Sequence, residues 1–194
     1  MFRARFSSFL VWILVLSFAG LAFASGEAPS DPKKQTSLGK YATSIEAYNQ
    51  WKAAPDKIFI IDCRTPQEYV YVGHAPMAVN IPSLVWTGKF DAEKKDVVLE
   101  KNPEFVSKVK NLYKPGDQIM MMCRSGQRSA ACAEELIKAG FTNVFNITDG
   151  FEGDKLNDKS SPNHGKRVVN GWKNSGAPWT YDLDLKLMPT LIQK

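Results

Sequence analysis

One short loop of this sequence combines a cysteine with a glycine and two arginines, directly after an apolar run. Its residues are Cys123, Arg124, Ser125, Gly126, Gln127, Arg128 and Ser129. The glycine allows successive backbone N–H groups to face inward, and the helix predicted from Ser129 adds its positive N-terminal end. Two guanidinium groups add permanent charge. Because each feature stabilises a thiolate over a thiol, we expect Cys123 to have a depressed pKa and to be reactive.

This loop therefore predicts a nucleophile, Cys123, in a binding site for an anionic substrate. The remaining loop residues, Arg124 to Ser129, are the candidate substrate-binding residues. The same electrostatic field would stabilise a terminal persulfide anion on the cysteine. The alternative is a buried, inert cysteine before an ordinary helix. It leaves the glycine and the two arginines without an explanation.

Short apolar runs alternate with helical patterns along the chain. Strands are predicted at residues 57–62, 78–81, 118–122 and 143–147. Capping boxes at Thr43 and Thr65 begin two helices, and further helices are predicted after Asn102 and from Ser129. This order predicts an α/β fold: an open parallel sheet with helices on both faces. Ligands gather at the carboxyl ends of such strands, which is where Cys123 lies.

Two stretches lack these patterns. Residues 25–39 are polar and rich in turn formers, so we expect a flexible leader before a domain at 40–194. Residues 83–101 look less regular, with exposed aromatic side chains among charges.

Four segments of the chain, in order, resemble motifs of the rhodanese family. They are DCRTPQEY at 62–69, GHAPMAVNIP at 73–82, CRSGQR at 123–128 and GWKNSGAPW at 171–179. Met77 stands where the family usually has glycine, and the polar loop 154–167 is an addition. The resemblance implies a rhodanese-like domain with this same open parallel sheet.

The resemblance also implies a sulfurtransferase that works by double displacement. The Cys123 thiolate would take the outer sulfur of thiosulfate, or of polysulfide, while the backbone amides and Arg124 or Arg128 hold the departing sulfite. The persulfide would then pass its sulfur to cyanide or a thiol. No metal or organic cofactor is expected.

Two other functions remain open on the sequence. Phosphatases and arsenate reductases on this fold separate the cysteine and the arginine by five residues, whereas four lie between Cys123 and Arg128. The shorter ring of amides favours a sulfur atom over a tetrahedral oxyanion. A persulfide carrier or partner-binding module without turnover is the second alternative.

Several other polar residues and thiols are expected to be structural. Arg64 is expected to form an ion pair, with Glu68 as the candidate partner. His74 is expected to support the fold, because a thiolate needs no general base. Cys63 and Cys132 are expected to be buried and reduced, although either could resolve a persulfide or the two could form a disulfide.

The N-terminus predicts export. Residues 1–24 contain two arginines, an apolar run at 9–18 and small residues at Ala22 and Ala24, which together are typical of a cleaved signal peptide. A retained anchor is the alternative, but the run is short for a membrane span. We therefore expect a periplasmic or secreted protein without a stable membrane anchor, and a periplasmic protein is one candidate sulfur acceptor. The formal net charge is +5, but the basic residues are scattered among acidic ones. Nucleic acid is therefore not an expected partner.

Overall fold

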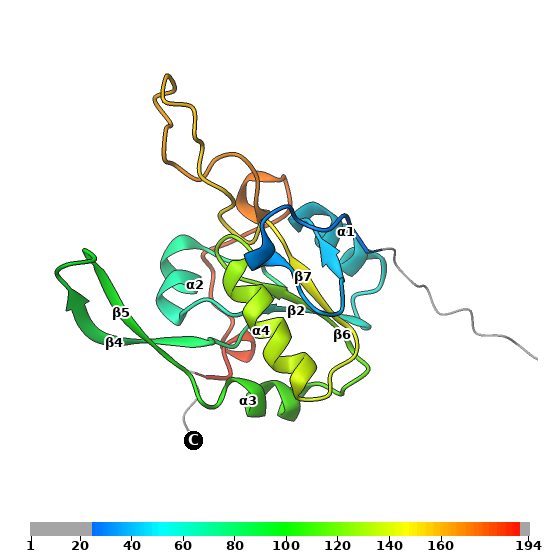
Figure 1. Cartoon of the computed structure of the whole chain (residues 1–194). Helices are drawn as coiled ribbons and strands as arrows, with labels where there is room; N and C mark the ends of the chain where they lie inside the picture. Colours follow the sequence, from blue (N-terminus) through cyan, green and yellow to red (C-terminus); the bar gives the residue numbers. More distant parts are fainter. Residues whose placement is uncertain (1–24, 191–194) are drawn as a thin grey trace, which may run out of the picture.

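A five-stranded parallel sheet lies at the centre of the computed structural model, which describes residues 25–190 (Figure 1). The strand order is β1-β7-β6-β2-β3. The strands are β1 (Tyr41–Ala42), β2 (Ile58–Asp62), β3 (Val79–Asn80), β6 (Gln118–Met122) and β7 (Val144–Ile147). The predicted signal peptide, residues 1–24, lies outside the described residues.

Helices cover both faces of this sheet, which confirms the predicted fold class. The helices are α1 (Ser44–Ala53), α2 (Pro66–Val72), α3 (Phe105–Leu112) and α4 (Gln127–Lys138). Successive residues of a strand face opposite sides. On β6, Met120 packs in one core cluster with Ala47 of α1, whereas Met121 packs in a second cluster with Leu136 of α4. The sheet therefore has a buried core on each side, as a parallel sheet requires.

The two predicted capping boxes are confirmed. Thr43 and Glu46 cap α1, and Thr65 and Glu68 cap α2, in each case with both reciprocal hydrogen bonds. The second box has a further consequence, because it fixes the backbone of Glu68 beside the cysteine loop.

The expectation of irregular structure at residues 83–101 is wrong. Strands β4 (Leu84–Asp91) and β5 (Asp96–Lys101) form an antiparallel hairpin that projects from the body (Figure 1). The alternation of apolar and polar residues is interrupted by a register shift between Trp86 and Phe90, where Gly88 has a φ of 78°. That shift obscures the period of two by which a strand is recognised.

Residues 25–39, whose composition suggests a flexible leader, make contacts with the domain. Gln127 Nε2 donates a hydrogen bond to Asp31 at 2.8 Å, and Lys34 Nζ lies 2.9 Å from the Asp154 carboxylate. The segment, which includes a short 3-10 helix at Pro32–Lys34, thus lies against the start of α4. Its partners are more than ninety positions away in sequence, so local composition could not reveal them.

The added loop at 154–167, orange in Figure 1, projects from the body at the top of the view, apart from the hairpin. An isolated antiparallel bridge between Lys155 and Arg167 closes its base. Within residues 25–190, no helix combines the length and the apolar character that crossing a bilayer requires.

Candidate active site

Cys123 follows the last residue of β6 and lies at the floor of the loop that leads into α4. Its side chain is almost fully buried, with 1% of the residue exposed. The Gly126 N–H donates to Cys123 Sγ at 3.2 Å, and Ser129 Oγ lies 3.4 Å from the same sulfur. The sulfur thus lies at the carboxyl end of the central strand, within reach of a backbone N–H and a hydroxyl group of the loop.

The environment of Cys123 favours its thiolate. Burial raises the pKa of this thiol, but hydrogen bonds from Cys63 and Ser129 and the charge of Arg128 outweigh burial, and the pKa lies well below its usual value. Burial raises the pKa of the Cys63 thiol well above its usual value, and contact with Cys123 raises it further. The two opposite shifts favour the negative charge on Cys123 over Cys63.

Strand pairing places Cys63 beside Cys123. Asp62 and Met122 are paired in register, and the Cys63 N–H donates to the Met122 carbonyl at 2.8 Å. Both thiols belong to the core cluster on the α3 and α4 side of the sheet, together with Cys132. All three cysteines are buried and free.

Replacing Cys63 with alanine is expected to raise the pKa of Cys123, because the thiolate loses a hydrogen-bond donor. The measurement is the ultraviolet absorbance of the thiolate against pH, with a Cys123→Ser protein subtracted. Cys132→Ala is the matched control, since it removes another buried thiol of the same cluster. Equal titration curves for the two alanine variants would show that Cys63 does not tune the nucleophile.

Gly126 is the N-cap of α4 and has a φ of 97°, in the region that favours glycine. A Cβ at this position would lie 2.1 Å from the Thr148 carbonyl oxygen, so glycine is required by contact as well as by φ. The helix begins at Gln127, two residues earlier than predicted. Gln127 and Arg128 therefore belong to its first turn, and its positive end faces the sulfur.

Asn146 supports the loop from β7 and was not predicted from the sequence. Its side-chain amide donates to the Gly126 carbonyl at 3.0 Å and to the Lys34 carbonyl at 2.8 Å, while its oxygen lies 2.6 Å from Ser129 Oγ. A polar residue in the middle of an apolar strand was the available signal, because a buried amide must find partners.

The chain after β7 supports the outer side of the loop. The Phe151 N–H donates to the Cys123 carbonyl at 2.7 Å, and the Glu152 N–H donates to the Arg124 carbonyl at 2.9 Å. Gly150 lies so close that a Cβ would be 2.6 Å from the Cys123 carbonyl oxygen. The loop backbone is therefore held from outside as well as from inside.

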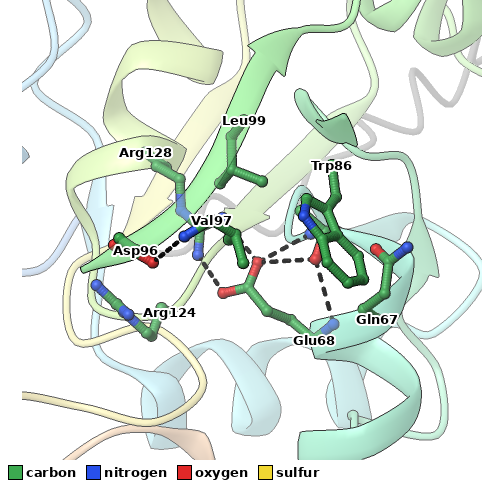
Figure 2. A pocket seen from close by; sticks show the side chains of 9 residues that line it. Gln67, Glu68, Trp86, Asp96, Val97, Leu99, Arg124 and Arg128 are labelled. Atoms are coloured by element: carbon green, nitrogen blue, oxygen red, sulfur yellow. Dashed lines mark hydrogen bonds and ion pairs between the residues drawn. The ribbon is translucent and has the colours of Figure 1, made fainter. Parts of the chain in front are cut away.

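The two arginines of the loop have different roles (Figure 2). Arg128 makes a two-pronged ion pair with Glu68 of α2, with contacts of 2.8 and 2.5 Å. The predicted pairing of Arg64 with Glu68 is therefore wrong. Arg124 is exposed and, among the described residues, has no carboxylate within ion-pair distance. Arg124 is thus the loop cation that is free to meet an incoming anion.

The Glu68 carboxylate is expected to make the free energy of unfolding depend on pH. Burial raises its pKa, but the ion pair with Arg128 outweighs burial and lowers the pKa to about 2 from 4.5. Because the folded-state pKa is depressed, the stabilisation is complete above about pH 4.5 and is lost as the pH falls through about 2. It amounts to roughly 2 kcal/mol, since a pKa unit is worth about 1.4 kcal/mol and water screens a partly exposed pair.

The Glu68→Gln variant tests this dependence, because glutamine retains a capping side chain but carries no charge. Urea unfolding between pH 7 and pH 2 measures the free energy. At pH 7 we expect the wild type to have a larger free energy of unfolding than the variant. This difference should disappear on acidification. A gap that stays constant over this range would contradict the assignment.

Arg64 and His74 are held by contacts within the domain. Arg64 is fully buried and pairs with Asp62, with Nη2 2.6 Å from the carboxylate and 2.8 Å from the Gly73 carbonyl oxygen. His74 stacks on Tyr69, with ring centroids 3.8 Å apart, and its Nδ1 lies 3.1 Å from the Tyr69 carbonyl oxygen. Neither side chain is a hydrogen-bond partner of the cysteine. No group of three or more metal-ligating side chains occurs in the part of the chain that the structure describes.

Comparisons with known proteins agree with this geometry. The Rhodanese-like domain family model matches residues 44–157. Senescence-associated protein DIN1 of Raphanus sativus is 35% identical over 91 residues, which are 47% of this chain and 45% of that protein. Thiosulfate sulfurtransferase 16 of Arabidopsis thaliana, a chloroplastic protein, is 34% identical over 91 residues, 47% of this chain and 68% of that protein. This chain thus spans about half the length of the first of these relatives.

A solved structure shows the same fold. Rv0390 from M. tuberculosis has a TM-score of 0.57 and 24% identity, and the match covers 74% of this chain and all of that one.

Proposed function

Because this chain belongs to the rhodanese-like domain family, we propose that it is a sulfurtransferase that carries sulfane sulfur as a persulfide on Cys123. One observation carries the proposal: the Cys123 sulfur lies under a loop whose N–H and hydroxyl groups converge on it, in an environment that favours the thiolate. The name of the Arabidopsis relative adds support, since that protein is a thiosulfate sulfurtransferase.

The first half of the reaction loads the cysteine. The Cys123 thiolate attacks the outer sulfur of thiosulfate, a new S–S bond forms, and the S–S bond of thiosulfate breaks so that sulfite leaves with the electron pair. Arg124 offsets the charge of the departing sulfite, because Arg128 is occupied by Glu68. The Gly126 N–H and the first turn of α4 stabilise the persulfide anion that remains.

The second half of the reaction unloads it. A nucleophile such as cyanide attacks the terminal sulfur, thiocyanate leaves, and the electron pair of the broken bond returns to Cys123 as a thiolate. No proton has to be supplied in either half, so neither His74 nor another general base is needed. Polysulfide would load the cysteine by the same displacement.

The test is to expose the purified protein to thiosulfate and then to cyanide. We expect the intact mass to rise by one sulfur atom, the gain to be removed by a reducing agent, and thiocyanate to form over many turnovers. A persulfide that forms without thiocyanate release would instead support a carrier. Absence of any sulfur adduct would refute both proposals.

We also propose that this reaction takes place outside the cytoplasm. The charged start, short apolar run and small residues of the N-terminus support export. N-terminal sequencing of protein from a periplasmic or culture fraction is expected to begin at Ser25. Full-length protein confined to the cytoplasm would contradict this location.

A further inference from the structure

A lysine near the start of the described chain lies against the cysteine loop. Lys34 ends the short 3-10 helix Pro32–Lys34, in the blue segment that lies beside α4 in Figure 1. A Cβ added to Gly126 would lie 3.2 Å from Lys34 Cδ, so the lysine stem packs on this glycine. The side chain of Lys34 is only 12% exposed, whereas lysine is rarely buried because its charge favours water. Lys34 is therefore part of the packing around the loop rather than a free surface charge.

Two partners fix Lys34. Its Nζ lies 2.9 Å from the Asp154 carboxylate, which offsets the burial of the ammonium group, and Asn170 Nδ2 holds the same carboxylate at 3.0 Å. The Lys34 carbonyl accepts from Asn146 Nδ2 at 2.8 Å, and the same nitrogen donates to the Gly126 carbonyl at 3.0 Å. Asn146 thus ties the backbone of Lys34 to the backbone of Gly126, so a shift of one residue is transmitted to the other.

The turn that carries Lys34 is joined to α4 by a second contact. The Asp31 carboxylate caps this turn, because it accepts from the Lys33 N–H at 3.0 Å. The same carboxylate accepts from Gln127 Nε2 at 2.8 Å. The N-cap of α4, Gly126, and its first residue, Gln127, are therefore both held by the segment that precedes β1.

Gly126 is also the residue whose N–H donates to the nucleophile. The distance from this nitrogen to Cys123 Sγ is 3.2 Å. A hydrogen bond to the ionised form of a group lowers its pKa, and the bond weakens steeply when its angle departs from linearity. A displacement of the Gly126 backbone therefore changes how strongly the thiolate of Cys123 is favoured.

We propose that Lys34 is a positioning residue for Cys123. It acts through Gly126, because its stem and its carbonyl hold the backbone of that glycine so that the N–H stays aimed at the sulfur. The positive charge of Lys34 is not the agent, since the ammonium is paired with Asp154 and the apolar stem makes the contact with the loop. The inference rests on the proposed function, in which the same N–H stabilises the thiolate and the persulfide anion.

The experiment measures the pKa of Cys123 in the full protein, from the ultraviolet absorbance of the thiolate against pH with a matching Cys123→Ser protein subtracted. In Lys34→Ala the stem is lost, and we expect the pKa of Cys123 to rise by about one unit, a ten-fold shift of the equilibrium between thiol and thiolate. Lys34→Met keeps a stem of similar length without the charge, so the pKa should stay close to the wild-type value. Urea unfolding of each variant checks that it is folded over the pH range of the titration.

Lys33→Ala is the matched control, because Lys33 belongs to the same 3-10 helix but is exposed. It removes the same charge and should leave the pKa of Cys123 unchanged. Equal pKa shifts in Lys34→Ala and Lys34→Met would show that the charge acts rather than the stem, and would overturn the inference. A depressed wild-type pKa that Lys34→Ala leaves unchanged refutes only the role of Lys34, whereas an ordinary pKa for Cys123 in the wild type removes the thiolate on which the proposed function depends.

Discussion

Cys123→Ser is expected to abolish sulfur transfer from thiosulfate, with a loss of at least about a thousand-fold in turnover. Serine keeps the size of the side chain, but its hydroxyl is not ionised near neutral pH and cannot form a persulfide. The donors that hold Cys123 Sγ would hold the serine oxygen instead, so the fold should survive. Thiocyanate formation and intact mass after thiosulfate exposure measure the effect together.

Two further variants test whether the effect belongs to the Cys123 thiol alone. Cys63→Ser and Cys132→Ser each remove a buried cysteine of the same cluster and leave Cys123 in place. Both should still take up one sulfur atom. Sulfur uptake by Cys123→Ser would mean that one of the other thiols can act as the nucleophile.

Gly126→Ala is expected to inactivate the protein by displacing the loop backbone. The added Cβ would lie 2.1 Å from the Thr148 carbonyl oxygen and 2.7 Å from its carbonyl carbon, so the backbone on one side must move. The variant also forces alanine into a φ of 97°. The N–H that donates to Cys123 Sγ belongs to this same residue. We expect stability to fall by roughly 3 kcal/mol, as steric overlap and strained φ combine.

Gly140→Ala separates the steric effect from the effect of φ. Gly140 follows the other end of α4 and has a φ of 100°, but a Cβ added there would meet no atom within 4 Å. It should lose about 1 kcal/mol and remain active. Thermal unfolding and sulfur loading measure both variants. If the two alanines were equally harmful, backbone strain alone would explain the result and contact with Thr148 would not matter.

The sequence predicted the local features of the site better than its ion pairs. The loop from Cys123 to Ser129 and the capping boxes depend on residues that are close together in sequence, and local patterns reveal such features. The pairing of Arg128 with Glu68 joins residues sixty positions apart. Nothing in the local pattern distinguishes Glu68 as a partner of Arg128 rather than of Arg64.

Two other segments show what a local pattern leaves out. Residues 25–39 contact Gln127, Asn146 and Asp154, none of which is near them in sequence. The hairpin was missed because a register shift interrupts the alternation of its first strand. The strands that the sequence did predict are buried on both faces, where composition alone is informative.

The parallel pairing of β1 with β7 has a consequence for the order of folding. β1 is the first strand along the chain and β7 the last, so their ladder joins segments with one of the largest sequence separations in the sheet. Contacts of this kind form late and slow the search for the native state. Asn146, which holds Gly126 and Lys34 together, lies in that same ladder opposite Tyr41. We therefore expect the loop of the nucleophile to be completed only when the sheet closes, so that a half-folded chain would lack a finished active site.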